Sequence, residues 1–138
     1  MSYEANLITD GMQTVTTTLN STALYGVGGS GQFLACTQST TAAGVVTLCT
    51  STTRFMGVIQ NKPAANQAAN VGIFGVTKIV AGSTIAAGDL LQSDANGRAI
   101  TSASSVGSGA YVIGIAREAA AAADVVIAMN IIPYGRPL

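Results

Sequence analysis

The chain offers few side chains that can attack bonds or move protons. It has no histidine, which excludes triads with an imidazole base and the usual His-ligated metal sites. The two cysteines, Cys36 and Cys49, match no metal motif in their spacing, and no histidine can activate them. We therefore expect two free, half-buried thiols that support no catalysis, with one disulfide between them as the alternative.

The acidic residues near turns are explained by the turns themselves. Asp89 lies in a Gly-Asp pair, and residues 94–97 read Asp-Ala-Asn-Gly. Asp and Asn side chains at such places bond their own backbone. Arg117 and Glu118 are interpreted as a surface pair at a strand end. The sequence therefore predicts no enzyme, no cofactor and no metal site.

The charge pattern limits the classes of partner. Six basic and six acidic residues give a net charge of zero, and only 9% of the residues are charged. Because the basic residues form no run, we expect no nucleic-acid partner. The apolar stretches are too short for a membrane span, and the first residues do not resemble a signal peptide. So little charge gives weak self-repulsion, which favours a protein that works in an assembly.

Short β-strands are the elements that must position these residues. Segments rich in β-branched and aromatic residues alternate with Gly, Asn, Asp or Pro. We expect strands at residues 32–36, 45–49, 55–60, 71–80, 90–92, 111–117 and 124–132. Asn96-Gly97 is a strong hairpin signal because both positions tolerate positive φ. Residues 61–69 and 118–123 are too short for stable helices and are interpreted as loops. The prediction is an all-β domain, a small barrel or sandwich, over residues 31–138.

An internal echo suggests two similar β units. A shift of 57 residues aligns Gly31 with Gly88, Leu34 with Leu91, Ala42 with Ala99, Ser51 with Ser108, and Gly57 with Gly114. Beyond an Ala-rich loop in each half, Ile73 aligns with Ile127. A duplication and a chance match both remain open. In either case, the two units could pack into one small barrel.

Residues 1–30 form a different, Thr-rich and Gly-rich segment. Val15 and Leu19 lie in a stretch with β-type alternation, and residues 26–31 are a Gly-rich linker without the Gly-Lys-Ser/Thr ending of a phosphate loop. The segment is either a frayed terminus or an extended arm that is ordered against a neighbouring subunit. In the second case, Leu7, Val15 and Leu19 are candidate interface residues, and the arm adds a strand to a neighbour's sheet edge.

The C-terminal residues are the second candidate for an interface. Two prolines fix an extended backbone there, and Tyr and Arg are enriched at interface anchors. The alternative is an ordinary capped tail. The candidate interface residues are Ile131, Ile132, Tyr134 and Arg136.

The order of motifs in the second half resembles a known family. Residues 85–91 read Ile-Ala-Ala-Gly-Asp-Leu-Leu, and residues 94–98 read Asp-Ala-Asn-Gly-Arg. Ile-Gly-Ile-Ala at 113–116, an Ala-rich loop and Asp-Val-Val-Ile at 124–127 complete the pattern. The stretch from about residue 55 to 130 resembles capsid decoration (cement) proteins of tailed bacteriophages, of the small β-barrel kind.

The resemblance implies a structural virion protein without enzymatic activity. Such proteins bind the outside of an expanded phage head, often as homotrimers, and clamp neighbouring major capsid subunits together. The implied partners are the major capsid protein and further copies of this chain, on the capsid exterior after synthesis in the host cytoplasm. Two alternatives remain. One is another virion component, such as a head-fibre base or a tail-tube-like subunit, and the other is a small SAF-like β-clip domain that binds a ligand.

Overall fold

All elements found in the described residues are β-strands. The computed structural model describes residues 12–19, 31–63, 67–102 and 107–138, and only the backbone of residues 12–19. No helix occurs among these residues, and the all-β prediction is confirmed. The strands are β1 (Met12–Leu19), β2 (Ala35–Gln38), β3 (Val45–Leu48), β4 (Gly57–Ile59), β5 (Ala68–Val80), β6 (Leu90–Ser93), β7 (Ala99–Thr101), β8 (Tyr111–Ala116) and β9 (Val126–Pro137).

The first five strands form a closed ring of pairings. β3 pairs with β2, β2 with β4 and β4 with β5, all antiparallel. β1 closes the ring because it runs antiparallel to β5 and meets β3 in parallel at Thr18↔Val45 and Leu19↔Val46. A closed ring leaves no free sheet edge. The sequence analysis considered that the N-terminal arm adds a strand to a neighbour's sheet. Residues 12–19 of that arm instead form β1, which pairs with β3 and β5 of its own chain.

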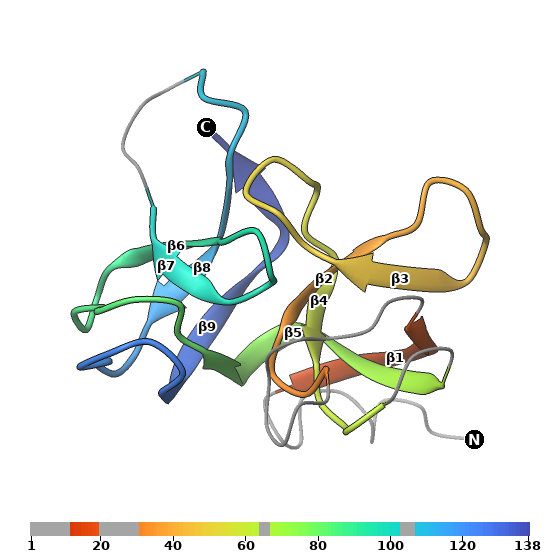
Figure 1. Cartoon of the computed structure of the whole chain (residues 1–138), viewed down its shortest axis with the longest axis horizontal. Helices are drawn as coiled ribbons and strands as arrows, with labels where there is room; N and C mark the ends of the chain where they lie inside the picture. Colours follow the sequence, from red (N-terminus) through yellow and green to blue (C-terminus); the bar gives the residue numbers. More distant parts are fainter. Residues whose placement is uncertain (1–11, 20–30, 64–66, 103–106) are drawn as a thin grey trace.

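The second half repeats this arrangement and shares β5 with the first. β5 pairs with β9, β9 with β8, β8 with β6 and β6 with β7. A single parallel bridge, Ala81↔Ala99, joins the end of β5 to β7. Figure 1 shows β6 to β9 in one half of the molecule and β1 to β4 in the other, with β5 passing between them. The predicted small, barrel-like β fold is thus confirmed, and its two similar halves belong to one curled sheet and share β5.

The internal echo corresponds to equivalent strands. The order β3-β2-β4-β5 in one half matches β7-β6-β8-β9 in the other. The alignment expected beyond the Ala-rich loop is wrong, however. Ile59 pairs with Val71, and the equivalent Ala116 pairs with Met129. Val71 is therefore the counterpart of Met129, and Ile73 does not correspond to Ile127.

The core is continuous across both halves. One buried cluster contains Phe55 and Val58 from the first half together with Ile113 and Met129 from the second. A smaller cluster lies in the first half alone and contains Cys36, Val46, Ile59, Ala69 and Val71. Because the larger cluster draws on both halves, folding of either ring depends on side chains of the other.

The turns follow the sequence signals in most places. Residues 118–123 form turns and bends without a helix, as expected. The Asp94–Gly97 turn joins β6 to β7, a short strand that the sequence reading missed. Only Gly97 of the Asn-Gly pair has a positive φ, of 81°. Its N–H bonds the Asp94 carbonyl, and its own carbonyl accepts the N–H of Ala35. The turn therefore docks the second half onto β2.

Candidate interaction surfaces

The predicted C-terminal tail is the end of β9. Its last residues continue the ladder with β8, where Val112 pairs with Arg136. Ile131 is only 8% exposed and packs in the shared core, and its role at an interface stays a prediction. Ile132 is partly buried, whereas Tyr134 and Arg136 are exposed. The strand thus presents Tyr134 and Arg136 to the surface.

The backbone at Tyr134 is held in an unusual conformation. Tyr134 has φ = 58° and Gly135 has φ = 71°, both in the left-handed region. A Cβ atom at Gly135 would lie 3.2 Å from Cβ of Phe55 and 3.4 Å from Cβ of Tyr111. For a residue other than glycine, a left-handed φ costs roughly 1–2 kcal/mol. The fold therefore tolerates backbone strain at a residue whose aromatic side chain is exposed. Backbone strain of this kind clusters at functional sites.

Tyr134 lines a groove in the described part of the surface. The groove has a volume of about 810 Å³ and runs between the β2–β3 hairpin, the segment before β4, and β9. Its lining consists of Thr37, Gln38, Ser39, Thr40, Thr41, Thr47, Thr53, Arg54, Phe55, Met56 and Tyr134. Arg54 is the single charged residue among them, and its guanidinium lies 5.5 Å from the ring centre of Tyr111. Neutral hydroxyls beside aromatic and thioether groups suit an uncharged peptide segment better than an ion.

The N-terminal candidates are only partly described. Leu7 lies outside the described residues. Val15 and Leu19 lie in β1, where Val15 pairs with Val71 of β5 and Leu19 with Val46 of β3. Their backbones therefore have partners within the chain, and their role at an interface stays a prediction.

A row of exposed apolar side chains crosses the second half and was missed in the sequence. Val76 of β5 pairs with Asn130 of β9, Asn130 with Ile115 of β8, and Ile115 with Leu90 of β6. Directly paired residues place their side chains on the same face of a sheet. Val76, Ile115 and Leu90 are 41%, 39% and 39% exposed. We call Val76, Asn130, Ile115 and Leu90 the apolar row. The members come from four different strands, so only the strand register brings them together.

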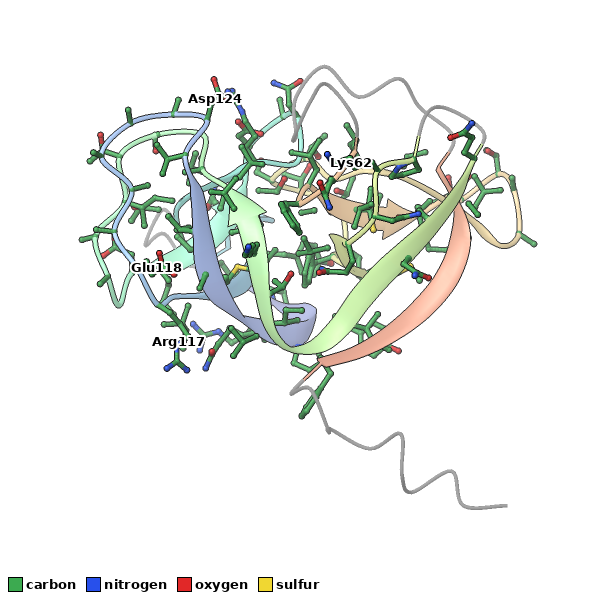
Figure 2. The ribbon with its side chains drawn as sticks, turned by 90° about the horizontal axis from the view of Figure 1, so that it is seen from below. Lys62, Arg117, Glu118 and Asp124 are labelled. Carbon is green, nitrogen blue, oxygen red and sulfur yellow. The ribbon has the colours of Figure 1, made fainter. Side chains whose placement is uncertain are left out.

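Two cations border the apolar row. Lys78 follows Val76 by two positions on β5 and is exposed. Nη1 of Arg117 donates a hydrogen bond of 3.2 Å to Oδ1 of Asn130, within the row itself. Figure 2 shows Arg117 and Glu118 next to each other at the surface beside β9, far from Lys62. Because the exposed Glu118 follows Arg117, charges of both signs lie beside the row.

The two thiols are buried and unsuited to chemistry. Both are free. Burial raises the pKa of Cys36 well above its ordinary value, and the nearby Cys49 raises it further. Burial likewise raises the pKa of Cys49, to about 12. Because the thiolate is the reactive form, both side chains act as small core residues.

The acidic residues serve the turns, as the sequence predicted. Oδ2 of Asp89 accepts the N–H of Ala86 at 3.0 Å and the hydroxyl of Thr101 at 2.9 Å. Oδ1 of Asp94 accepts the N–H groups of Asn96 and Arg98. Within the part of the chain that is described, no three His, Cys, Asp or Glu side chains are grouped so as to hold a metal ion. The same part contains no helix that is long and apolar enough to cross a membrane.

Comparison with known proteins identifies the class. The sequence matches the phage cement protein family over residues 8–131, and the chain belongs to that family. It is therefore a structural phage protein. No curated protein matches the chain.

A solved structure with a similar fold also comes from a phage head. It is the N base of head fiber gp8.5 in bacteriophage phi29, with a TM-score of 0.61 and 19% identity. The match covers 91% of this chain and 98% of the other. At this identity the likeness shows a shared fold.

Proposed function

We propose that this chain attaches to the outside of a phage capsid and strengthens the contacts between neighbouring major capsid subunits. The match to the phage cement family over most of the chain carries this proposal. The surface chemistry supports it, because few charges, many small side chains and exposed apolar groups suit attachment by broad contact. The protein acts through binding, without a catalytic step.

The capsid subunit is proposed to contact the groove and the end of β9. Tyr134 and Arg136 are the proposed anchors, with Ile132 beside them, because Tyr and Arg dominate binding energy at many interfaces. The hydroxyl-lined groove accepts an uncharged, extended segment of the capsid subunit. Leu7, Val15 and Leu19 are proposed to add contacts on the N-terminal side.

Several copies are proposed to act together as a homotrimer on the capsid exterior, after synthesis in the host cytoplasm. With a net charge of zero, the subunits repel one another weakly. Linked copies gain avidity because the second and third attachments become intramolecular. Individual contacts can therefore be weak while the whole assembly holds firmly.

Binding to decoration-free heads tests the proposal directly. Purified protein is mixed with heads that lack it, and we expect stoichiometric attachment and heads that withstand higher temperature. A protein that is folded but never binds heads refutes the proposal. The contribution of the N-terminal segment is measured by removing residues 1–11 only. A longer deletion removes β1, which closes the first ring, and so confuses lost binding with lost folding.

A head-fibre base is the second candidate function. The fold shared with the N base of head fiber gp8.5 favours it. A density map of the particle separates the two, because a cement protein lies between capsid subunits, whereas a fibre base carries a projecting fibre above it.

A further inference from the structure

Two threonines on neighbouring strands line the groove together. Thr37 of β2 and Thr47 of β3 are direct partners in the antiparallel ladder, so their side chains lie on the same face of the sheet. Both residues line the groove, and both are half-buried. Direct partners have Cβ atoms about 5 Å apart, which is close enough for the two hydroxyls to contact the same residue of a ligand.

The hydroxyls of this pair have no hydrogen-bond partner within the described part of the chain. The hydroxyl of Thr53, which lines the same groove, is used differently. It accepts the N–H of Thr50 at 2.8 Å and donates to the Thr50 carbonyl at 3.2 Å. Most polar groups that are withdrawn from water in native proteins have such partners, and each exception needs an explanation. A ligand in the groove would supply the partners that Thr37 and Thr47 lack.

The wall of the groove beside the pair is preformed, because the loop of the β2–β3 hairpin bonds to itself. Nε2 of Gln38 donates to the carbonyl oxygen of Ala42 at 3.2 Å and to that of Val45 at 3.0 Å. Oγ of Ser39 accepts the N–H groups of Thr41 and Ala42, each at 3.2 Å. A wall that is already ordered lowers the entropic cost of binding. The groove is therefore built to receive a ligand without refolding the loop.

The pair of hydroxyls fits the backbone of an extended peptide. In an extended chain, the N–H and C=O of one residue point to the same side, as they do in a hydrogen-bonded pair of strands. A threonine hydroxyl can accept a hydrogen bond from an N–H or donate one to a C=O. One hydroxyl can therefore bind the N–H and the other the C=O of a single ligand residue. Neither bond needs a charged group or a particular side chain on the ligand.

We propose that Thr37 and Thr47 bind the backbone of one residue of an uncharged capsid segment, with one hydroxyl accepting its N–H and the other donating to its C=O. The proposal rests on the proposed function, which places this segment in the groove. It adds the chemistry of recognition, in which the pair selects an extended backbone and Tyr134 supplies the aromatic contact.

Valine and serine variants separate the hydroxyl from the methyl group in head binding. Thr37→Val and Thr47→Val keep the shape and the strand preference but each lose one hydroxyl, so we expect each to bind decoration-free heads about tenfold more weakly. Thr37→Ser keeps the hydroxyl and should stay within about twofold of the natural chain. Thr84→Val is the control, because Thr84 is exposed and lies outside the groove. If both Thr37→Val and Thr47→Val bind as tightly as this control, the proposal is overturned while attachment to heads stands.

A blocked tripeptide tests the same site without a capsid. The probe is N-acetyl-trialanine N-methylamide, which is uncharged and offers a backbone with methyl side chains only. We expect saturable shifts of the NMR signals of Thr37 and Thr47 as the probe is added, and no such shifts at Thr84. The matched ester analogue, in which an oxygen replaces each alanine N–H, should bind severalfold more weakly because it cannot donate to a hydroxyl.

The outcomes of the peptide test are independent of the head-binding assay. Shifts that are absent at the pair, or that are unchanged in a Thr37→Val, Thr47→Val double variant, overturn the proposal. Equal binding of the amide and ester probes also overturns it. If the tripeptide binds at the pair but the natural chain never attaches to heads, the proposed function fails and the site for an uncharged peptide backbone stands.

Discussion

Gly57 and Gly114 occupy equivalent places in the two halves, and neither has room for a Cβ atom. A Cβ at Gly57 would collide with the carbonyl oxygen of Gly72, and one at Gly114 with the carbonyl oxygen of Asn130. In each half, the glycine lets the short strand approach its long neighbour, β5 or β9. The internal echo in the sequence is therefore a repeated packing requirement.

Alanine at either glycine is predicted to be severely destabilising. Gly57→Ala and Gly114→Ala force a backbone carbonyl to move, and we expect each to lower the free energy of unfolding by about 3 kcal/mol. Gly88→Ala is the comparison, because its Cβ would meet no atom within 4 Å and only its φ of 89° is unfavourable. That variant is expected to lose about 1 kcal/mol. Urea unfolding measures all three, and equal losses would contradict the steric explanation.

The two ion pairs of Arg98 are predicted to differ in strength. Nε of Arg98 lies 2.8 Å from Oδ2 of Asp94, and both side chains are 15% exposed. Nη1 lies 3.1 Å from Oδ1 of Asp124, which is 63% exposed. Asp94→Asn is expected to lower the free energy of unfolding by about 1–2 kcal/mol. The Asp94 carboxylate also accepts two backbone N–H groups of its own turn, so the substitution weakens these bonds as well as the ion pair. Asp124→Asn is expected to cost less than about 0.5 kcal/mol. An equal or reversed order in urea unfolding contradicts this ranking.

The buried thiols predict a loss of stability in alkali. The pKa of Cys49 is raised from 9.0 to about 12 in the folded protein, so the unfolded chain releases its proton first. The stabilisation that comes from keeping the buried Cys49 thiol neutral is complete below pH 9. As the pH rises from 9 towards 12, the free energy of unfolding declines by about 1.4 kcal/mol per pH unit. Cys36 acts in the same direction. The Cys49→Ala variant removes one titrating group and should show a shallower decline. A slope equal to that of the natural chain would count against this account.

Local signals predicted much of the fold because they depend on neighbouring residues. The Asn96-Gly97 turn and the loop at 118–123 were read from their composition, and the shift that relates Gly57 to Gly114 was visible in the sequence. The three-residue strand β7 was missed because Ala99, Ile100 and Thr101 are too few to show a period. The alignment of Ile73 with Ile127 was wrong because the register of a strand is fixed by its cross-strand partners, which spacing in the sequence does not show.

The candidate surfaces were harder to predict because they depend on contacts between distant residues. Tyr134 was singled out by residue type, but its left-handed backbone follows from the packing of Gly135 against Phe55 and Tyr111. The pairing of β1 within its own chain depends on β3 and β5, and no pattern inside β1 distinguishes this from pairing with a neighbour. The apolar row exists only once four strands are in register.

Tyr134 offers a test that separates stability from attachment. At φ = 58°, glycine has no steric cost, whereas alanine keeps the strain and lacks the ring. We therefore expect Tyr134→Gly to be more stable than Tyr134→Ala by about 1 kcal/mol, the reverse of the usual order in a strand. The side chain is 57% exposed, so its removal costs little packing.

Attachment to heads should follow the side chain instead of the backbone. Both variants lose the aromatic anchor, and we expect each to bind decoration-free heads about tenfold more weakly, a change of about 1.4 kcal/mol. Tyr134→Phe retains the ring and should bind more tightly than either. If Tyr134→Gly binds heads as well as the natural chain, the capsid does not contact this residue, and the fold keeps a strained tyrosine there for another reason. If binding instead follows the stability order, with glycine above alanine, then the backbone shape of β9 determines attachment.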